Sequence, residues 1–161
     1  MCMQVIKQVI VLALALGLSS CAKAPEPAQE TSHQEVHEDL VNWRSDWGEQ
    51  IFKAAKQNDK PVILNLEAIW CHWCHVMKAE TYSNEEVAQI LNDKFINVRI
   101  NQDANAYLSN RYKRYGWPAT IIFNSKGEEI VKRAGYIEPE AMAGLLKAVL
   151  EDPSPERDYS A

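Results

Sequence analysis

Cys71 and Cys74 are the residues of this 161-residue chain best placed to do chemistry. They lie in the run WCHWCH at residues 70–75, after an apolar stretch and before a helical pattern. Two thiols at this spacing in the first turn of a helix can close a disulfide, and the positive end of the helix dipole favours a thiolate on the first. The pattern predicts reversible thiol–disulfide exchange in which Cys71 attacks and Cys74, deeper in the helix and less exposed, resolves the mixed disulfide.

Side chains around the two cysteines are candidates for tuning and for substrate contact. His72, between the thiols, could stabilise the thiolate when protonated, or it could be a solvent-facing spacer. Trp70 and Trp73 are expected to form a hydrophobic rim that receives protein substrates, because an active-site loop must stay accessible. Beyond a redox-active disulfide between Cys71 and Cys74, the sequence predicts no cofactor and no metal.

The elements that position these residues follow from hydrophobic periodicity, turn residues and capping signals. Helices are expected around 47–55, from Asn84, over 104–115 and from Pro139, and strands over 61–67, 96–100, 120–123 and 129–133. Residues 83–86 (SNEE) have the form of a capping box, which places a helix start near Asn84. With a helix at the cysteines, the order is α β α α β α β β α, an α/β fold with a mixed central sheet flanked by helices.

A second landmark is the segment GWPAT at residues 116–120, just before a predicted strand. Together with the Trp-Cys-x-x-Cys motif and the turn at Lys126-Gly127, it resembles the thioredoxin superfamily over residues 47–152. That resemblance implies a thioredoxin-like fold with a cis peptide bond before Pro118. It also implies that Trp117 and Pro118 form a wall on which substrate chains dock in an extended form.

Longer stretches of this sequence resemble two groups of proteins. Residues 71–77 (CHWCHVM) and 80–87 (ETYSNEEV) are similar to the thioredoxin-like domain that opens the spermatogenesis-associated thioredoxin-like proteins and their bacterial relatives. The large helical region that follows in that family does not fit into a chain of this length. The same region is similar to the periplasmic C-terminal domain of the transmembrane disulfide-interchange reductase. Only the thiol–disulfide chemistry is carried over from this resemblance. Together with the export signal at the N-terminus, the two motifs predict protein thiols or disulfides as substrates and a redox partner in the cell envelope.

One departure from the thioredoxin pattern bears on proton transfer. Thioredoxins keep a buried Asp six residues before the first cysteine, where it helps to move the proton of the resolving thiol, and this chain has Asn65 there. An amide cannot take up that proton. Glu67 lies on the same face of the strand by alternation and could act as the general base, or it could be a strand-end carboxylate that reaches water.

The N-terminus carries the features of an export signal. The ten-residue apolar run Val9–Leu18 follows Lys7 and is half of the ~20 residues that a membrane-spanning helix needs, so residues 1–20 are predicted to be a signal peptide. The run ends in LSSC, which resembles the lipobox of bacterial lipoproteins and implies a lipid on Cys21 that anchors the mature chain to a membrane. The alternative is a plain signal peptide that leaves Cys21 as a free thiol.

The remaining organisation follows from composition. Residues 21–42 are predicted to be a flexible tether, 43–152 the folded domain and 153–161 a flexible tail. The net charge of −5, with no basic block, disfavours nucleic acid as a partner. We expect a monomer on the periplasmic side of the bacterial cell envelope, because one exposed active site on a long tether suits that state.

Three other functions compete with thiol–disulfide exchange. Cys-x-x-Cys-His is also the pattern that attaches c-type haem in electron-transfer proteins, although such domains are mostly helical. Cys71, Cys74, His72 and His75 could instead hold zinc or copper, although four ligands within five residues cannot easily surround one ion. The third alternative is a non-catalytic thioredoxin-like binding domain, which leaves the two thiols unexplained.

Overall fold

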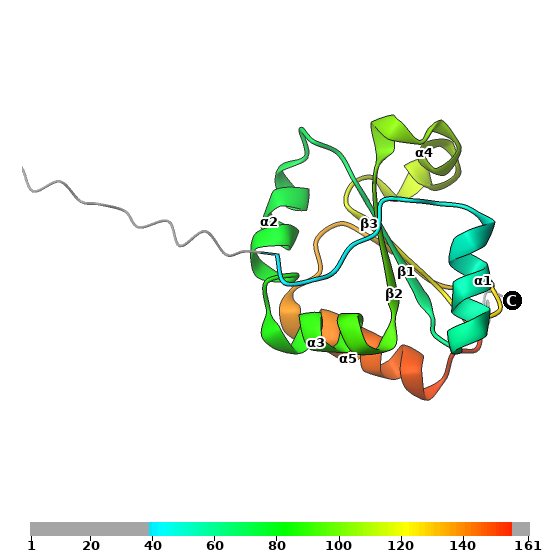
Figure 1. Cartoon of the computed structure of the whole chain (residues 1–161). Coiled ribbons are helices and arrows are strands. Elements are labelled where there is room, and N and C mark those ends of the chain that lie inside the picture. The colour runs from blue at the N-terminus through cyan, green and yellow to red at the C-terminus, as the bar shows by residue number, and fades with distance from the viewer. Residues whose placement is uncertain (1–38, 156–161) are drawn as a thin grey trace, which may run out of the picture. The chain divides into compact units, whose positions relative to one another are not determined.

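Figure 1 shows the computed structural model of the chain, which describes residues 39–155. Its centre is a four-stranded sheet in the order β2-β1-β3-β4. The strands are β1 (Val62–Glu67), β2 (Ile96–Asn101), β3 (Ala119–Phe123) and β4 (Glu129–Ala134). The predicted signal peptide, Cys21 and most of the predicted tether and tail lie outside the described residues.

The sheet is mixed, and β1 is one of its two central strands. β1 runs parallel to β2, with Val62 opposite Ile96, and antiparallel to β3, with Leu64 opposite Ile121. At the other edge β4 is the antiparallel partner of β3. Five of the six residues of β1 are buried, as expected for a strand covered on both faces, which explains its nearly continuous apolar sequence.

Helices cover both faces of the sheet (Figure 1). One face carries α1 (Glu49–Asn58) and α4 (Ala106–Tyr112), and the other carries α2 (His72–Glu80), α3 (Glu85–Lys94) and α5 (Pro139–Glu151). Short 3-10 helices, η1 (Gln102–Ala104) and η2 (Lys113–Tyr115), flank α4. Apart from these two turns the order is α β α α β α β β α, so the predicted α/β architecture is confirmed.

The sheet divides the core into two halves, because neighbouring side chains of a strand point to opposite faces. The half beneath α2, α3 and α5 includes Ile63, Met77, Tyr82, Leu91, Ile122 and Leu146. The half beneath α1 and α4 includes Ile51, Leu64, Leu66, Val98, Leu108 and Ile121. β1 contributes side chains to both halves, so helices pack on both of its faces. This packing fixes the end of β1, from which the chain leads directly to the cysteines.

The start of α3 differs from the predicted capping box. The N-cap is Asn84, whose side-chain oxygen accepts a 3.1 Å hydrogen bond from the Val87 N–H. The Ser83 hydroxyl instead donates to the carbonyl oxygen of Ala79 in α2. Because the two helices follow each other closely, the serine satisfies the end of the first helix and the asparagine the start of the second.

The single helix predicted over 104–115 is divided in the structure. Asn105 interrupts it and caps α4 by accepting a 3.0 Å hydrogen bond from the Leu108 N–H. Leu108 and Tyr112, the pair that predicted the helix, are both buried on α4. The chain then turns through η2 to Gly116, whose φ of 66° lies in the left-handed region that glycine adopts readily.

The folded domain begins earlier than the predicted boundary at residue 43. The Leu40 N–H donates a 3.0 Å hydrogen bond to the Tyr82 carbonyl, and the Val41 side chain is buried in the core half beneath α2. Leu40 and Val41 show neither helical nor strand periodicity, so the sequence alone assigns them to the tether. Among the helices of residues 39–155, none combines the length and the hydropathy that crossing a membrane requires.

Candidate active site

The disulfide between Cys71 and Cys74 lies between the end of β1 and the start of α2. After β1 the chain makes a turn in which the Cys71 N–H donates to the Ala68 carbonyl at 3.0 Å. Cys71 is the N-cap of α2, and its sulfur accepts a 3.2 Å hydrogen bond from the Cys74 N–H. The two Cα atoms lie 5.3 Å apart. The structure therefore pairs the two cysteines and sets the sulfur of Cys71 at the positive end of a helix.

Both cysteines are nearly covered in this oxidised state. Cys71 is 6% exposed and Cys74 5% exposed, so the predicted difference in exposure between them is negligible here. The reason is the disulfide, which holds both sulfurs in one small cluster with Ala68 and the half-buried Trp117. The access of a substrate to Cys71 therefore depends on the side chains that border the disulfide.

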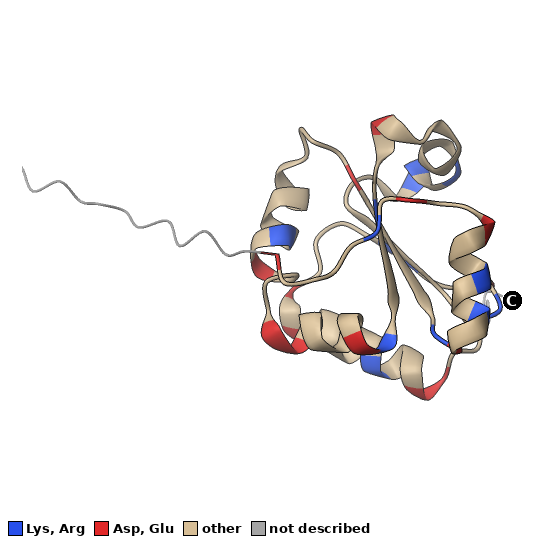
Figure 2. Ribbon diagram, in the orientation of Figure 1, with Lys and Arg blue, Asp and Glu red and all other residues tan. Residues whose placement is uncertain are grey.

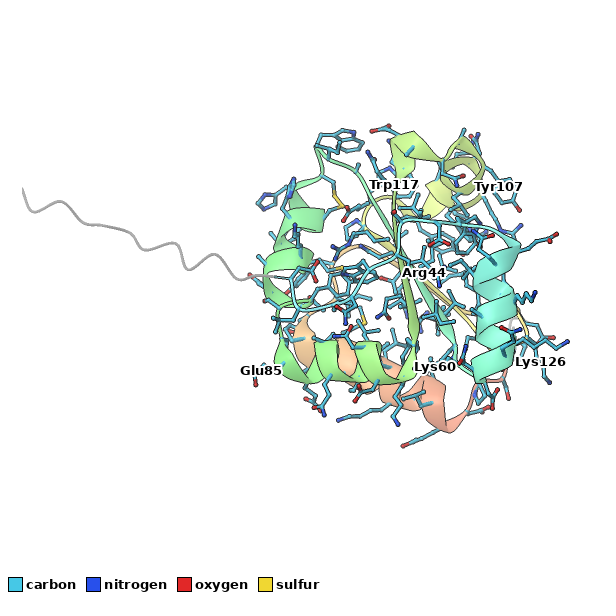
Figure 3. The ribbon with its side chains drawn as sticks, in the orientation of Figure 1. Arg44, Lys60, Glu85, Tyr107, Trp117 and Lys126 are labelled. Atoms are coloured by element: carbon cyan, nitrogen blue, oxygen red, sulfur yellow. A yellow bond between two sulfur atoms is a disulfide. The ribbon has the colours of Figure 1, made fainter. Side chains whose placement is uncertain are left out.

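The Trp117-Pro118 peptide bond is cis, as the resemblance to thioredoxins implies. Trp117, labelled in Figure 3, packs against the disulfide cluster, and Pro118 is buried. The Pro118 carbonyl accepts a 2.8 Å hydrogen bond from the Gly135 N–H, which ties this loop to the end of β4. Ala119, at the start of β3, pairs with Leu66, near the end of β1. The sheet therefore brings the proline motif and the cysteine motif together at the same end of its two central strands.

An exposed apolar rim, made of Ile69, Trp70 and Trp73, borders the disulfide. Their exposed fractions are 74%, 70% and 54%. The stretch from Ala68 to Met77 contains no Lys, Arg, Asp or Glu, and in Figure 2 the blue and red segments of α2 lie at its later turns. The sequence indicated both tryptophans but not Ile69, because the alternation of β1 ends before it and nothing marks which way its side chain turns.

The two histidines of the motif have different surroundings. His72 is exposed, and its ring lies 5.3 Å from that of Trp73 in an edge contact. The Nε2 atom of His75 lies 2.8 Å from the carbonyl oxygen of Ile69. Within residues 39–155, no three His, Cys, Asp or Glu side chains gather as ligands of a metal ion would. With its sulfurs joined and His75 bonded to the backbone, the motif has the geometry of an exchange site.

A polar row crosses the sheet beneath α2. Asn65 on β1 lies opposite Arg99 on β2 and Thr120 on β3. Tyr82, just after α2, covers this row, and the Arg99 guanidinium lies 5.3 Å from the centroid of its ring. Burial raises the pKa of Tyr82, while the charge of Arg99 acts in the opposite direction. The hydroxyl of Tyr82 therefore stays protonated at neutral pH.

Glu67, the predicted candidate base, is part of an ion pair. Its Oε2 atom lies 3.4 Å from Nε of Arg99, and Arg99 also pairs with Asp39. The Arg99 guanidinium lies 4.2 Å from the centroid of the Trp43 ring, and its side chain is only 15% exposed. Sequence reasoning missed this cluster, because Asp39 lies 60 residues from Arg99 and neither has a motif around it.

The fold and the site together define the class of this protein, a thioredoxin-like thiol–disulfide oxidoreductase with its disulfide at a helix N-terminus beside a cis proline. The chain belongs to the Thioredox_DsbH family, because the model of that family matches residues 28–152. The description of the family reads "Protein of unknown function, DUF255".

Known proteins of two groups are similar to this chain. It is 29% identical over 143 residues to spermatogenesis-associated protein 20 of Rattus norvegicus, and this match covers 77% of this chain and 18% of the relative. It is 30% identical over 104 residues to the thiol:disulfide interchange protein DsbD of Campylobacter jejuni, which covers 63% of this chain and 18% of the relative. The predicted similarity to both groups is confirmed, although the chain spans less than a fifth of the length of either relative.

Solved structures show the same fold. The structure titled DsbH Oxidoreductase matches with a TM-score of 0.58 and 19% sequence identity, covering 80% of this chain and 96% of that one. The predicted thioredoxin-like fold is therefore confirmed.

Proposed function

We propose that this chain is an exported thiol–disulfide oxidoreductase that exchanges with protein thiols or disulfides in the cell envelope. The observation that carries the proposal is the Cys71–Cys74 disulfide at the N-terminus of α2, packed against Trp117 beside the cis bond to Pro118. A disulfide that served only to stabilise the fold would not need an exposed, uncharged apolar border, whereas the docking of a protein substrate does.

In the reducing direction the reaction starts from the dithiol. The Cys71 thiolate attacks one sulfur of a substrate disulfide, forms an intermolecular disulfide and releases the other substrate sulfur as a thiolate, which takes up a proton. The Cys74 thiolate then attacks the sulfur of Cys71, closes the intramolecular disulfide and releases the second substrate thiolate. Two electrons pass to the substrate, and an external dithiol must reduce the chain again. The reverse steps oxidise a substrate dithiol.

Cys71 is the attacking residue in this proposal because of its place at the N-cap. A thiolate there gains from the hydrogen bond donated by the Cys74 N–H and from the dipole of α2. His72 follows directly and is exposed, so that its protonated form adds a positive charge close to the same sulfur. We propose that His72 thereby favours the thiolate and makes the disulfide more oxidising.

Substrates dock on the apolar surface around the disulfide. Trp70, in the turn before α2, and Trp73, on α2, offer exposed rings, and the half-buried Trp117 with the chain at Pro118 forms a docking wall beside the disulfide. An extended polypeptide that carries its own cysteine fits between them, because its backbone can pair with the chain next to Pro118 while its apolar side chains cover the rings.

Proton transfer at Cys74 is assigned to Glu67, since Asn65 has no group that titrates. The carboxylate accepts the proton of the Cys74 thiol and so generates the resolving thiolate. The same carboxylate is shared with the Arg99 guanidinium, whose Nε atom lies 3.4 Å from its Oε2 atom, so its contribution to the resolving step is expected to be modest.

The proposed location is the membrane surface on the periplasmic side. Residues 1–20 act as a signal peptide, and a lipid on Cys21 anchors a monomeric domain through the tether. A Cys21→Ala variant is expected to move from the membrane fraction to the soluble periplasmic fraction. Unchanged membrane fractionation of this variant would count against the anchor.

Cysteine variants of the full chain test the exchange reaction with insulin as the protein disulfide. Cys71→Ser is expected to abolish insulin reduction, and Cys74→Ser to accumulate a mixed disulfide through Cys71, visible on non-reducing gels and by mass spectrometry. Lys78→Gln, an exposed change later in α2, is the matched control. Reduction of insulin by Cys71→Ser at the wild-type rate would overturn the proposed function.

A further inference from the structure

We propose that His75 is a positioning residue that holds the apolar rim in place for protein substrates, an inference that rests on the proposed function. The histidine lies in α2, and its side chain reaches back to the turn that precedes the disulfide. The bond joins the functional helix to the segment that carries Ile69 and Trp70, the two most exposed members of the rim.

The chemistry of the contact fixes the form of the imidazole. The carbonyl oxygen of Ile69 can only accept a hydrogen bond, so the Nε2 atom that lies 2.8 Å from it must carry the hydrogen. The backbone of His75 supports the same connection, because its N–H donates to the Cys71 carbonyl at 3.3 Å. Side chain and backbone of one residue thus bond to both ends of the segment from Ile69 to Cys71.

The rim needs this support because burial cannot provide it. Ile69 and Trp70 are 74% and 70% exposed, so few packing contacts restrict where their side chains point. The hydrogen bond from His75 ends on the peptide that joins these two residues, and it therefore restrains the backbone from which both side chains project. It also restrains the turn that leads into Cys71, whose N–H bonds back to Ala68.

Ordering the rim in advance lowers the cost of docking a protein. A protein substrate that covers Ile69 and Trp70 has to immobilise them if the turn is free, and that lost freedom weakens binding. A small disulfide reaches the sulfur of Cys71 without covering the rim. Losing one such hydrogen bond is expected to raise the KM for a protein about three- to tenfold and to leave the reaction with a small disulfide unchanged.

The test compares insulin with cystamine as substrates of the reduced full chain. His75→Ala is expected to raise the KM for insulin about three- to tenfold with little change in kcat, and to react with cystamine at the wild-type rate. His75→Gln places an amide N–H close to the position of Nε2 and is expected to restore the KM, whereas the shorter side chain in His75→Asn is not. Lys78→Gln, exposed in the same helix, is the control. An unchanged KM for insulin in His75→Ala, or equal values for the Gln and Asn variants, would overturn the inference.

A measurement without turnover separates this inference from the proposed function. Nitrogen NMR of the full chain is expected to show His75 as the tautomer protonated at Nε2. If wild type reduces neither insulin nor cystamine, the proposed function fails, and slow exchange of the Nε2 hydrogen with solvent, compared with that of exposed His72, would still report the bond to Ile69. A tautomer protonated at Nδ1 would overturn the positioning role whatever the activity.

Discussion

The Nε atom of Arg99 lies 3.4 Å from Oε2 of Glu67, so the carboxylate nearest in sequence to the disulfide is already in an ion pair. The two side chains come from neighbouring parallel strands, and Asp39 pairs with the same guanidinium. Arg99 also lies opposite Asn65, the position at which thioredoxins carry a buried acid. The sheet behind this disulfide therefore presents a cation with its partners in place of a lone carboxyl group.

Replacing Glu67 by Gln is expected to slow the resolving step at Cys74 about two- to tenfold, below the usual effect of a general base. A small effect is expected because the Glu67 carboxylate is shared with the Arg99 guanidinium. Rapid quenching with an alkylating agent measures the lifetime of the mixed disulfide, with Glu85→Gln as an exposed control. Identical lifetimes for wild type and Glu67→Gln at every pH would remove Glu67 from the mechanism.

The spacing of apolar and polar residues predicts those parts of the fold that are formed by one continuous segment of the chain. β1 stands out by its apolar run, α5 by the spacing of Met142, Leu146 and Val149, and the cysteine pair by its position between a strand and a helix. The cluster of Asp39, Arg99 and Tyr82 could not be predicted, because its members meet only when the sheet has formed. No pattern in the sequence around any of them marks the others as partners.

The cap of α3 shows the same limit on a smaller scale. Ser83 and Asn84 are both good N-cap residues, and the choice between them depends on where α2 ends. Asn84→Ala is expected to lower the free energy of unfolding by about 1 kcal/mol, and Ser83→Ala to lower it by less. Urea denaturation of the two variants measures the difference. A larger loss for Ser83→Ala would mean that the serine caps the helix.

Truncating Leu64 and Ile69 compares the contributions of a buried and an exposed apolar side chain to the free energy of unfolding. Leu64 is fully buried in the central strand, so Leu64→Ala leaves a cavity and is expected to lower the free energy of unfolding by about 2–5 kcal/mol. Ile69→Ala removes an exposed side chain and is expected to change it by less than about 0.5 kcal/mol. Equal losses in urea denaturation would contradict the burial of one and the exposure of the other.

Glu129 gives the domain a pH-dependent contribution to stability. Burial alone raises the pKa of Glu129, but hydrogen bonds from Tyr112 and Arg111, both 2.6 Å from its Oε1, outweigh burial and the pKa is lowered. Because the pKa is lower in the folded than in the unfolded state, the stabilisation is complete above the ordinary value of 4.5 and is lost as the pH falls through the folded value.

Glu129→Gln is therefore expected to be less stable than wild type at neutral pH, with a difference that shrinks on acidification. Thermal unfolding over a series of acidic to neutral buffers measures this difference, and Glu140→Gln, exposed in the first turn of α5, is the control. A difference of constant size at all pH values would show that the ionisation of Glu129 does not contribute.

The most direct test of the account is a redox titration of the full chain against glutathione or dithiothreitol buffers, with the state of Cys71 and Cys74 followed by thiol alkylation and mass spectrometry. We expect one reversible two-electron transition in which both cysteines change together. A midpoint below about −200 mV would identify a reductant that needs an electron donor, and one above about −150 mV an oxidant of other proteins. Cysteines that stay unchanged over the whole range of potentials, or that titrate separately, would contradict the claim that this pair is a redox centre.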